Sequence, residues 1–146
     1  MSREQEVVAL IAKGEGRNLD LKRELSLSSS SAKAEFIKDI ISLANTGTPE
    51  GLLIIGVSDD GEFVGIAQLE EERIQQIISS YVTPMPEINC EIIEIGSDRV
   101  SIGIISVRGH ERPHKVSRGI ERLQQNEVFC DKAQSSCEPR QKKLLG

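Results

Sequence analysis

Residues 51–61 read Gly-Leu-Leu-Ile-Ile-Gly-Val-Ser-Asp-Asp-Gly, and this stretch decides the fold of the chain. Residues 51–57 are almost wholly apolar, which is typical of a central strand buried on both faces. Asp60-Gly61 favours a tight turn at 58–61, because these residues tolerate the positive φ that hairpin turns require. We therefore expect a hairpin in which residues 62–66 return as the partner strand.

Helices are predicted on both sides of this stretch. Apolar residues recur at helical spacing in residues 2–13, 32–44 and 69–81. Four consecutive serines, residues 28–31, precede the second of these segments and are suited to cap its N-terminus. A phosphate could also bind at such a helix start, and both roles remain open.

The remaining strands are predicted from alternating apolar residues at 19–24, 88–95 and 100–104. In residues 88–95 the apolar positions change phase midway, which indicates a β-bulge. Residues 108–119 read as a polar loop, and residues 127–130 as a last short strand. Helices mixed with hairpins predict an α+β domain, with a mixed or antiparallel sheet and about three helices packed on it.

Length and composition suit one domain with a single core, since the chain has 146 residues of which 38% are hydrophobic. We expect this domain to span residues 1–130, followed by a C-terminal tail or linker at 131–146. One Tyr, three Phe and no Trp argue against a protein that stacks single-stranded bases on many aromatic side chains. Three cysteines without a CxxC pair indicate neither a disulfide framework nor a zinc ribbon.

No apolar run approaches the ~20 residues that a membrane-spanning helix needs. The N-terminus carries acids and lacks the apolar core of a signal peptide. We therefore expect a cytoplasmic protein that has no membrane partner.

Charge is unevenly distributed along the chain. Residues 1–107 hold 9 Lys and Arg against 18 Asp and Glu, whereas residues 108–146 hold 9 against 5. An acidic body with a basic flank indicates where an anionic partner would bind. A solvated basic tail would give the same count.

The basic residues suited to phosphate contacts lie mostly in this flank, because planar guanidinium groups and lysine amines bind phosphate oxygens. The candidate nucleic-acid-binding residues are Lys22, Arg23, Arg108, Arg112, Lys115, Arg118 and Arg122. Two histidines, His110 and His114, lie among them at a spacing that matches no common metal site.

Three carboxylates form a second candidate site, at Glu15, Asp20 and Asp59. Such a set can hold Mg²⁺ or Mn²⁺, which stabilises charge during phosphoryl displacement, and Lys22 could assist from the same strand face as Asp20. These four residues are the catalytic candidates of a nuclease. Alternatively, Glu15 is a surface acid, Asp20 pairs with Lys22 or Arg23, and Asp59 only forms the turn.

Three segments together resemble one family. Residues 14–24 (GEGRNLDLKRE), residues 40–46 (IISLANT) and residues 51–61 resemble, in order and spacing, the motifs of the Schlafen/AlbA-like domain, once described as a divergent ATPase. Two departures stand out. Asp20 lies where Glu is usual, and the strand at 127–130 lacks the Arg that often follows it. No GxxxxGK[ST] loop is present, so ATP binding is not expected.

The resemblance implies nucleic-acid binding, often as the N-terminal module of bacterial regulators, and RNA cleavage by three carboxylates in some eukaryotic relatives. Our first hypothesis is a non-enzymatic nucleic-acid-binding module of a transcriptional regulator, with DNA preferred and no cofactor. The alternatives are a Mg²⁺- or Mn²⁺-dependent nuclease and a scaffold that forms homo-oligomers. We expect that the three acids do not make the chain an efficient nuclease.

Overall fold

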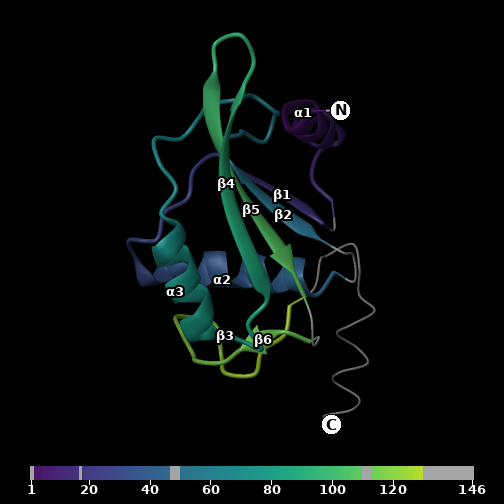
Figure 1. Cartoon of the computed structure of the whole chain (residues 1–146). Coiled ribbons are helices and arrows are strands. Elements are labelled where there is room, and N and C mark those ends of the chain that lie inside the picture. The colour runs from purple at the N-terminus through teal and green to yellow at the C-terminus, as the bar shows by residue number, and fades with distance from the viewer. Residues whose placement is uncertain (1, 17, 47–49, 110–112, 130–146) are drawn as a thin grey trace.

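The computed structural model describes residues 2–16, 18–46, 50–109 and 113–129. Within these ranges the chain forms three helices and two sheets (Figure 1). The helices are α1 (Arg3–Lys13), α2 (Ser30–Ala44) and α3 (Glu71–Tyr81). The strands are β1 (Leu19–Lys22), β2 (Gly51–Ile55), β3 (Val82–Thr83), β4 (Glu87–Ile95), β5 (Val100–Arg108) and β6 (Lys115–Val116). The predicted α+β class is confirmed.

The larger sheet has the strand order β1-β2-β5-β4. β1 pairs with β2 in parallel, and the other neighbours are antiparallel. All five residues of β2 are buried, and Leu53 and Ile54 are fully inaccessible. The central strand predicted from its apolar run is therefore confirmed, although it ends at Ile55 rather than at residue 57.

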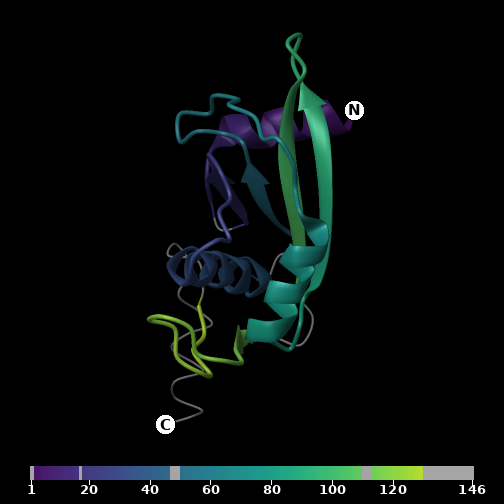
Figure 2. The ribbon, with the colours of Figure 1, turned by 90° about the vertical axis from the view of Figure 1, so that its left-hand side faces the viewer.

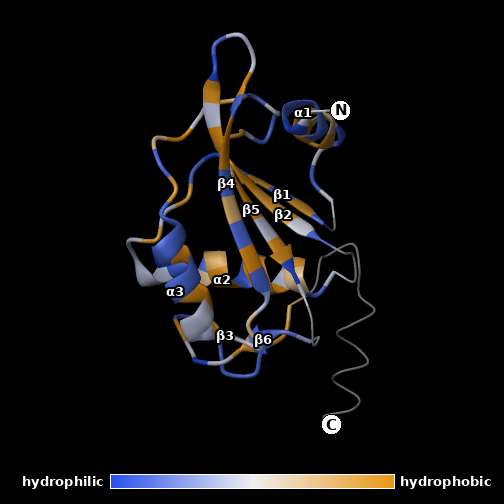
Figure 3. Cartoon of the chain, viewed as in Figure 1, coloured by the Kyte–Doolittle hydropathy of each residue, from blue (hydrophilic) through white to orange (hydrophobic). Residues whose placement is uncertain are grey.

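The two faces of this sheet support two apolar clusters, because alternate residues of a strand point to opposite faces. Leu53 and Ile105 belong to the cluster that includes α2 and α3. Leu52 and Ile104 belong to the cluster that includes Val7 and Ile11 of α1. Figure 3 shows β2 mostly in the hydrophobic colour, and α1 end-on with one hydrophilic and one hydrophobic side.

α2 begins with the predicted serine cap, and a serine also caps α1. The Ser2 side chain accepts a hydrogen bond from the Gln5 amide and forms a capping box, and the Ser29 side chain accepts one from Ala32. Gly14, with φ of 83°, ends α1 in a conformation that favours glycine. No helix in the described ranges is long and apolar enough to cross a membrane.

The predicted partner strand at 62–66 is wrong. β1 and β5 occupy both edges of β2, so the returning segment makes only a single backbone bridge, between Val57 and Phe63. The amides of Val64 and Gly65 both donate to the Gly56 carbonyl, and Ile66 donates to Ser101. The segment therefore turns away from β2 and crosses beside β5.

The predicted bulge in residues 88–95 is also wrong, because β4 and β5 pair without interruption from Glu87↔Arg108 to Ile95↔Val100. The apolar phase changes because the strand passes from one cluster to the other. Ile88 and Cys90 pack against the cluster of α2 and α3, whereas Ile95 lies in the cluster of α1. Figure 2 shows this long hairpin extending past the level of α1.

The C-terminal part of the described chain differs from its prediction. Residues 115–116, predicted as polar loop, form β6 and pair with β3. Residues 127–129 are not a strand, and Cys130 lies outside the described ranges. The predicted strand start lies in a turn instead, because the Glu127 amide donates to the Gln124 carbonyl and Asn126 has φ of 73°.

Candidate nucleic-acid interface and acidic pair

The acidic site is built on the short strand β1. Leu19 and Leu21 are buried on one face, so Asp20 and Lys22 point to the other face, as the alternation predicts. Glu15 precedes the strand, and its carboxylate accepts a hydrogen bond of 2.9 Å from the Leu21 amide. This backbone contact brings Glu15 beside Asp20.

The carboxyl groups of Glu15 and Asp20 are hydrogen-bonded to each other. Burial, the bond to Glu15 and the negative charge of Asp39 raise the pKa of Asp20 to about 7. The same bond, donated by the protonated Asp20, lowers the pKa of Glu15. Below about pH 7 the pair therefore holds one shared proton.

Lys22 is held between carboxylates rather than offered to a ligand. Its amine lies 3.0 Å from Asp39 on α2 and 3.7 Å from Asp20. The Asp39 contact links β1 to α2 across 17 positions, and no local pattern in the sequence indicated it. Lys22 thus serves as a counter-ion for the acids, which lessens its value as a phosphate ligand.

Asp59 is exposed in the turn after β2. The structure brings Glu15 and Asp20 together, but the described residues contain no group of three or more His, Cys, Asp and Glu side chains that could hold a metal ion. A pair that shares a proton supplies few of the oxygen ligands that Mg²⁺ prefers. The three predicted acids therefore do not lie together, and a metal site at the Glu15–Asp20 pair stays a prediction.

The basic segment, defined here as residues 113–129, is anchored to the domain by Asn45 at the end of α2. The Asn45 amide donates to the carbonyls of His114 and Phe129, at 2.9 and 3.0 Å. Its oxygen accepts a bond of 2.7 Å from the His114 amide. The fully buried His114 ring also contacts the Pro84 carbonyl.

Cations of the basic segment lie on its outer side. The Arg118 guanidinium lies 5.4 Å from the centre of the Tyr81 ring, a cation–π contact that composition alone could not reveal. Arg122 is exposed, and Lys115 is half-buried. Lys38 of α2 lies 5.6 Å from the centre of the Phe129 ring, at the other end of the segment.

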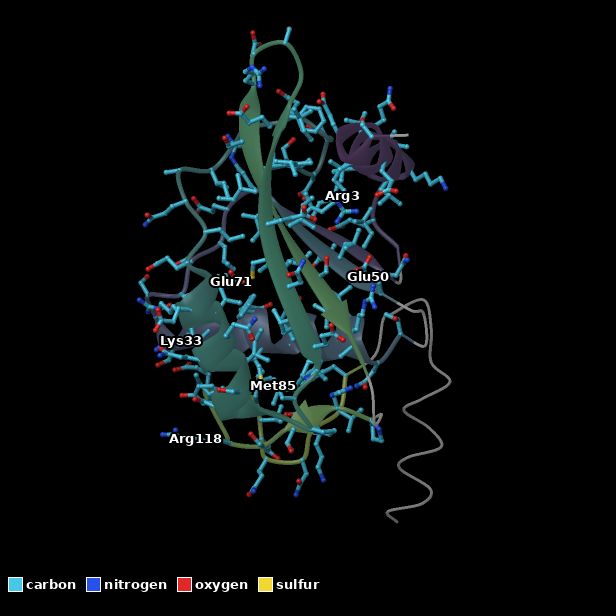
Figure 4. The ribbon with its side chains drawn as sticks, viewed as in Figure 1. Arg3, Lys33, Glu50, Glu71, Met85 and Arg118 are labelled. Carbon is cyan, nitrogen blue, oxygen red and sulfur yellow. The ribbon has the colours of Figure 1, made fainter. Side chains whose placement is uncertain are left out.

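The other predicted phosphate ligands do not join this group. Arg108 lies 3.7 Å from Glu50, and Figure 4 shows Glu50 and Arg118 on opposite sides of the molecule. Arg23 is exposed just after β1. Arg112 and His110 lie outside the described residues. The predicted phosphate ligands therefore lie on separate surfaces. Three of them, Lys115, Arg118 and Arg122, lie in the basic segment.

A cavity of about 350 Å³ lies between the segment after β1 and the segment before α3, and the sequence did not predict it. Its lining includes Leu25, Ile66 and Leu69. The acids Glu24 and Glu70 also line it, so the cavity is unsuited to a phosphate.

Comparison with known proteins agrees with this fold. The model of the Schlafen, AlbA_2 family matches residues 15–140. The chain is similar in structure to the DIP2311 protein of Corynebacterium diphtheriae, with a TM-score of 0.54 and 16% sequence identity. That similarity covers 88% of this chain but only 29% of the other, and it concerns the fold alone. No curated protein matches the chain.

Proposed function

The chain belongs to the Schlafen AlbA_2 family, and from this membership and its anchored basic segment we propose that it is a nucleic-acid-binding module. The proposal rests on the three hydrogen bonds by which Asn45 holds His114 and Phe129, called the Asn45 clamp below. A loosely solvated loop would have neither this clamp nor the pairing of β6 with β3. The cations of the segment are therefore held on a folded surface, which lowers the entropic cost of binding a phosphate chain.

The chemistry favours contacts to the phosphate backbone over contacts to bases. Arg118 and Arg122 present guanidinium groups, which suit phosphate oxygens. Tyr81 is the chain's one tyrosine and is covered by Arg118. We propose duplex DNA as the preferred ligand, bound with little sequence specificity and in the setting of a transcriptional regulator.

The test compares two variants of equal charge change. Arg118→Gln/Arg122→Gln removes two cations of the basic segment, and Lys13→Glu changes the net charge by the same two units on α1. Affinity for duplex DNA, single-stranded DNA and RNA is measured at several salt concentrations. Each phosphate contact contributes about 0.9 to the log–log salt slope on B-DNA, so we expect the first variant to lose up to ~1.8.

The control variant should keep the native slope. Equal losses in both variants would mean that only the net charge matters, and an unchanged slope in both would remove the basic segment from the interface. Tighter binding of RNA than of duplex DNA would overturn the proposed ligand while leaving the interface in place.

Metal-dependent cleavage is a second candidate, favoured by the hydrogen-bonded Glu15–Asp20 pair beside Lys22. The assay incubates the chain with labelled tRNA, single-stranded DNA and duplex DNA in Mg²⁺ or Mn²⁺. We expect no multiple-turnover cleavage, because Asp59 does not complete the pair. Cleavage that Asp20→Asn and Asp59→Ala both abolish would make the nuclease the primary function.

A further inference from the structure

β4 is an outer strand of the large sheet, since it pairs only with β5 within the described residues. In an antiparallel pair, directly opposed residues alternate between those that exchange backbone hydrogen bonds and those whose amide and carbonyl point away from each other. The outer edge of β4 therefore exposes the backbone groups of every second residue.

Two hydrogen bonds identify those residues. The Ser101 carbonyl accepts from the Ile66 amide, so Ser101 points away from its opposite residue, Glu94. By alternation, the outward residues of β4 are Ile88, Cys90, Ile92 and Glu94. The second bond agrees independently, because the Gln75 side chain of α3 donates to the Ile88 carbonyl from outside the strand.

Gln75 closes the edge at Ile88 only. In the described part of the chain, no donor or acceptor reaches the outward backbone groups of Cys90, Ile92 and Glu94. Ile92 is 48% exposed, the highest value among the large hydrophobic side chains that lie on the surface. An open hydrogen-bonding row beside an exposed isoleucine is a template for another strand.

Charged side chains often protect such an edge, but here the carboxylates already have partners. Arg3 of α1 pairs with Glu91, and Arg99 pairs with Glu94. Residues 91–95 of β4 therefore carry little uncompensated charge that would repel an incoming strand.

We propose that β4 pairs antiparallel with β4 of a second copy of this chain, about a two-fold axis at Ile92. In this register Ile92 lies opposite Ile92 of the second copy, Cys90 opposite Glu94, and Glu91 opposite Ile93. No carboxylate faces another. A register centred on Glu91 would oppose two glutamates, and one centred on Ile93 would set Cys90 against Gly96, beyond the strand.

This charge-matched register is the reason for naming a second copy rather than another protein. The contact is confined to one strand edge, which lies at the small end of protein interfaces. We therefore expect a reversible dimer whose population rises with concentration.

Sedimentation of the full chain across a wide concentration range tests the dimer. Ile92→Pro removes an outward N–H and leaves the ladder to β5 intact, because that amide does not donate to β5. It should abolish the dimer without changing the circular dichroism spectrum. Ile92→Lys should do the same, whereas Val64→Lys, at another exposed apolar residue, should leave the dimer unchanged.

Disulfide trapping tests the register. Opposed residues that exchange hydrogen bonds have Cα atoms about 5.5 Å apart, within disulfide reach. Glu94→Cys, in a Cys130→Ser/Cys137→Ser background, should cross-link to Cys90 of the second copy under mild oxidation, and Ile93→Cys should not.

A chain that stays monomeric at millimolar concentration would refute the proposal. So would a dimer that Ile92→Pro leaves intact, or one that cross-links equally through residue 93. A peptide strand of different sequence that binds β4 more tightly than a second copy does would replace the proposed occupant.

Discussion

Asn45 is the side chain whose replacement tests the architecture most directly. It is only 6% exposed, and it makes three hydrogen bonds to residues that lie 69 and 84 positions away in the sequence. Alanine removes all three bonds. Aspartate has the same shape and keeps the acceptor for the His114 amide, but it sets a carboxylate against two carbonyls.

The expected cost follows from these contacts. Each neutral hydrogen bond contributes about 1 kcal/mol, and a buried donor left without a partner costs about 1–3 kcal/mol more. Asn45→Ala should therefore lower the free energy of unfolding by about 4–6 kcal/mol, a large share of the roughly 5–15 kcal/mol of a typical domain. Asn45→Asp should cost at least as much, because it combines lost donors with a buried charge.

Urea unfolding of both variants measures this loss, with Asn89→Ala and Asn89→Asp as controls on the exposed side of β4. Hydrogen exchange of the Val116 amide, which donates to Glu127 within the basic segment, separates local release of the segment from global unfolding. A loss below about 1 kcal/mol in both Asn45 variants, with Val116 still protected, would refute the clamp.

Two further predictions concern stability. Folding raises the pKa of Asp20 from 3.8 to about 7. The proton that it binds therefore stabilises the fold fully below pH 4, and this contribution is lost as the pH rises through 7. Asp20→Asn should therefore be more stable than the native chain at pH 8 but not at pH 4 in urea unfolding, and equal pH profiles of the two chains would contradict this. A Cβ on Gly51 would lie 2.9 Å from the Leu43 Cβ. Gly51→Ala should therefore lower the melting temperature and reduce the free energy of unfolding by about 1–3 kcal/mol. Gly16→Ala, where no atom lies within 4 Å of the added Cβ, should be nearly neutral.

The elements that were predicted correctly are those specified by local sequence. The apolar run of β2 and the helical spacing of α2 each determine their own burial, so both elements occur close to their predicted bounds. The errors lie where partners are distant in the sequence. β5, rather than residues 62–66, pairs with β2, and β5 begins more than thirty residues later in the sequence.

The candidate site was predicted less completely, for the same physical reason. Alternation along β1 placed Asp20 and Lys22 on one face, but their neutralisation by Asp39 depends on the packing of α2. The resemblance singled out the Ala-Asn-Thr end of that helix without assigning Asn45 a role. Its hydrogen bonds to His114 and Phe129 exist only in the folded chain.

The proposed dimer and the proposed interface are geometrically compatible. The basic segment contains β6, which pairs with β3, and residues 84–86 join β3 to Glu87 at the start of β4. Five positions separate Glu87 from the axis at Ile92, roughly 17 Å at about 3.4 Å per residue, so the two copies of Glu87 would lie roughly 34 Å apart along the strand direction. The basic segments join the chain beyond this end of β4, so their cations would lie on opposite ends of the dimer. Adjacent half-sites on B-DNA are about 34 Å apart.

One dimer could therefore place two basic segments on separate turns of the same duplex. The dimer cross-linked between Cys90 and Glu94→Cys should then show about twice the salt slope of the monomeric Ile92→Pro variant on a duplex of about 30 base pairs, because counterion release scales with the number of phosphate contacts. On a duplex of about 8 base pairs, which is too short to reach both segments, the two slopes should be equal. Equal slopes on both duplexes would mean that the dimer, if it forms, presents only one segment to DNA at a time.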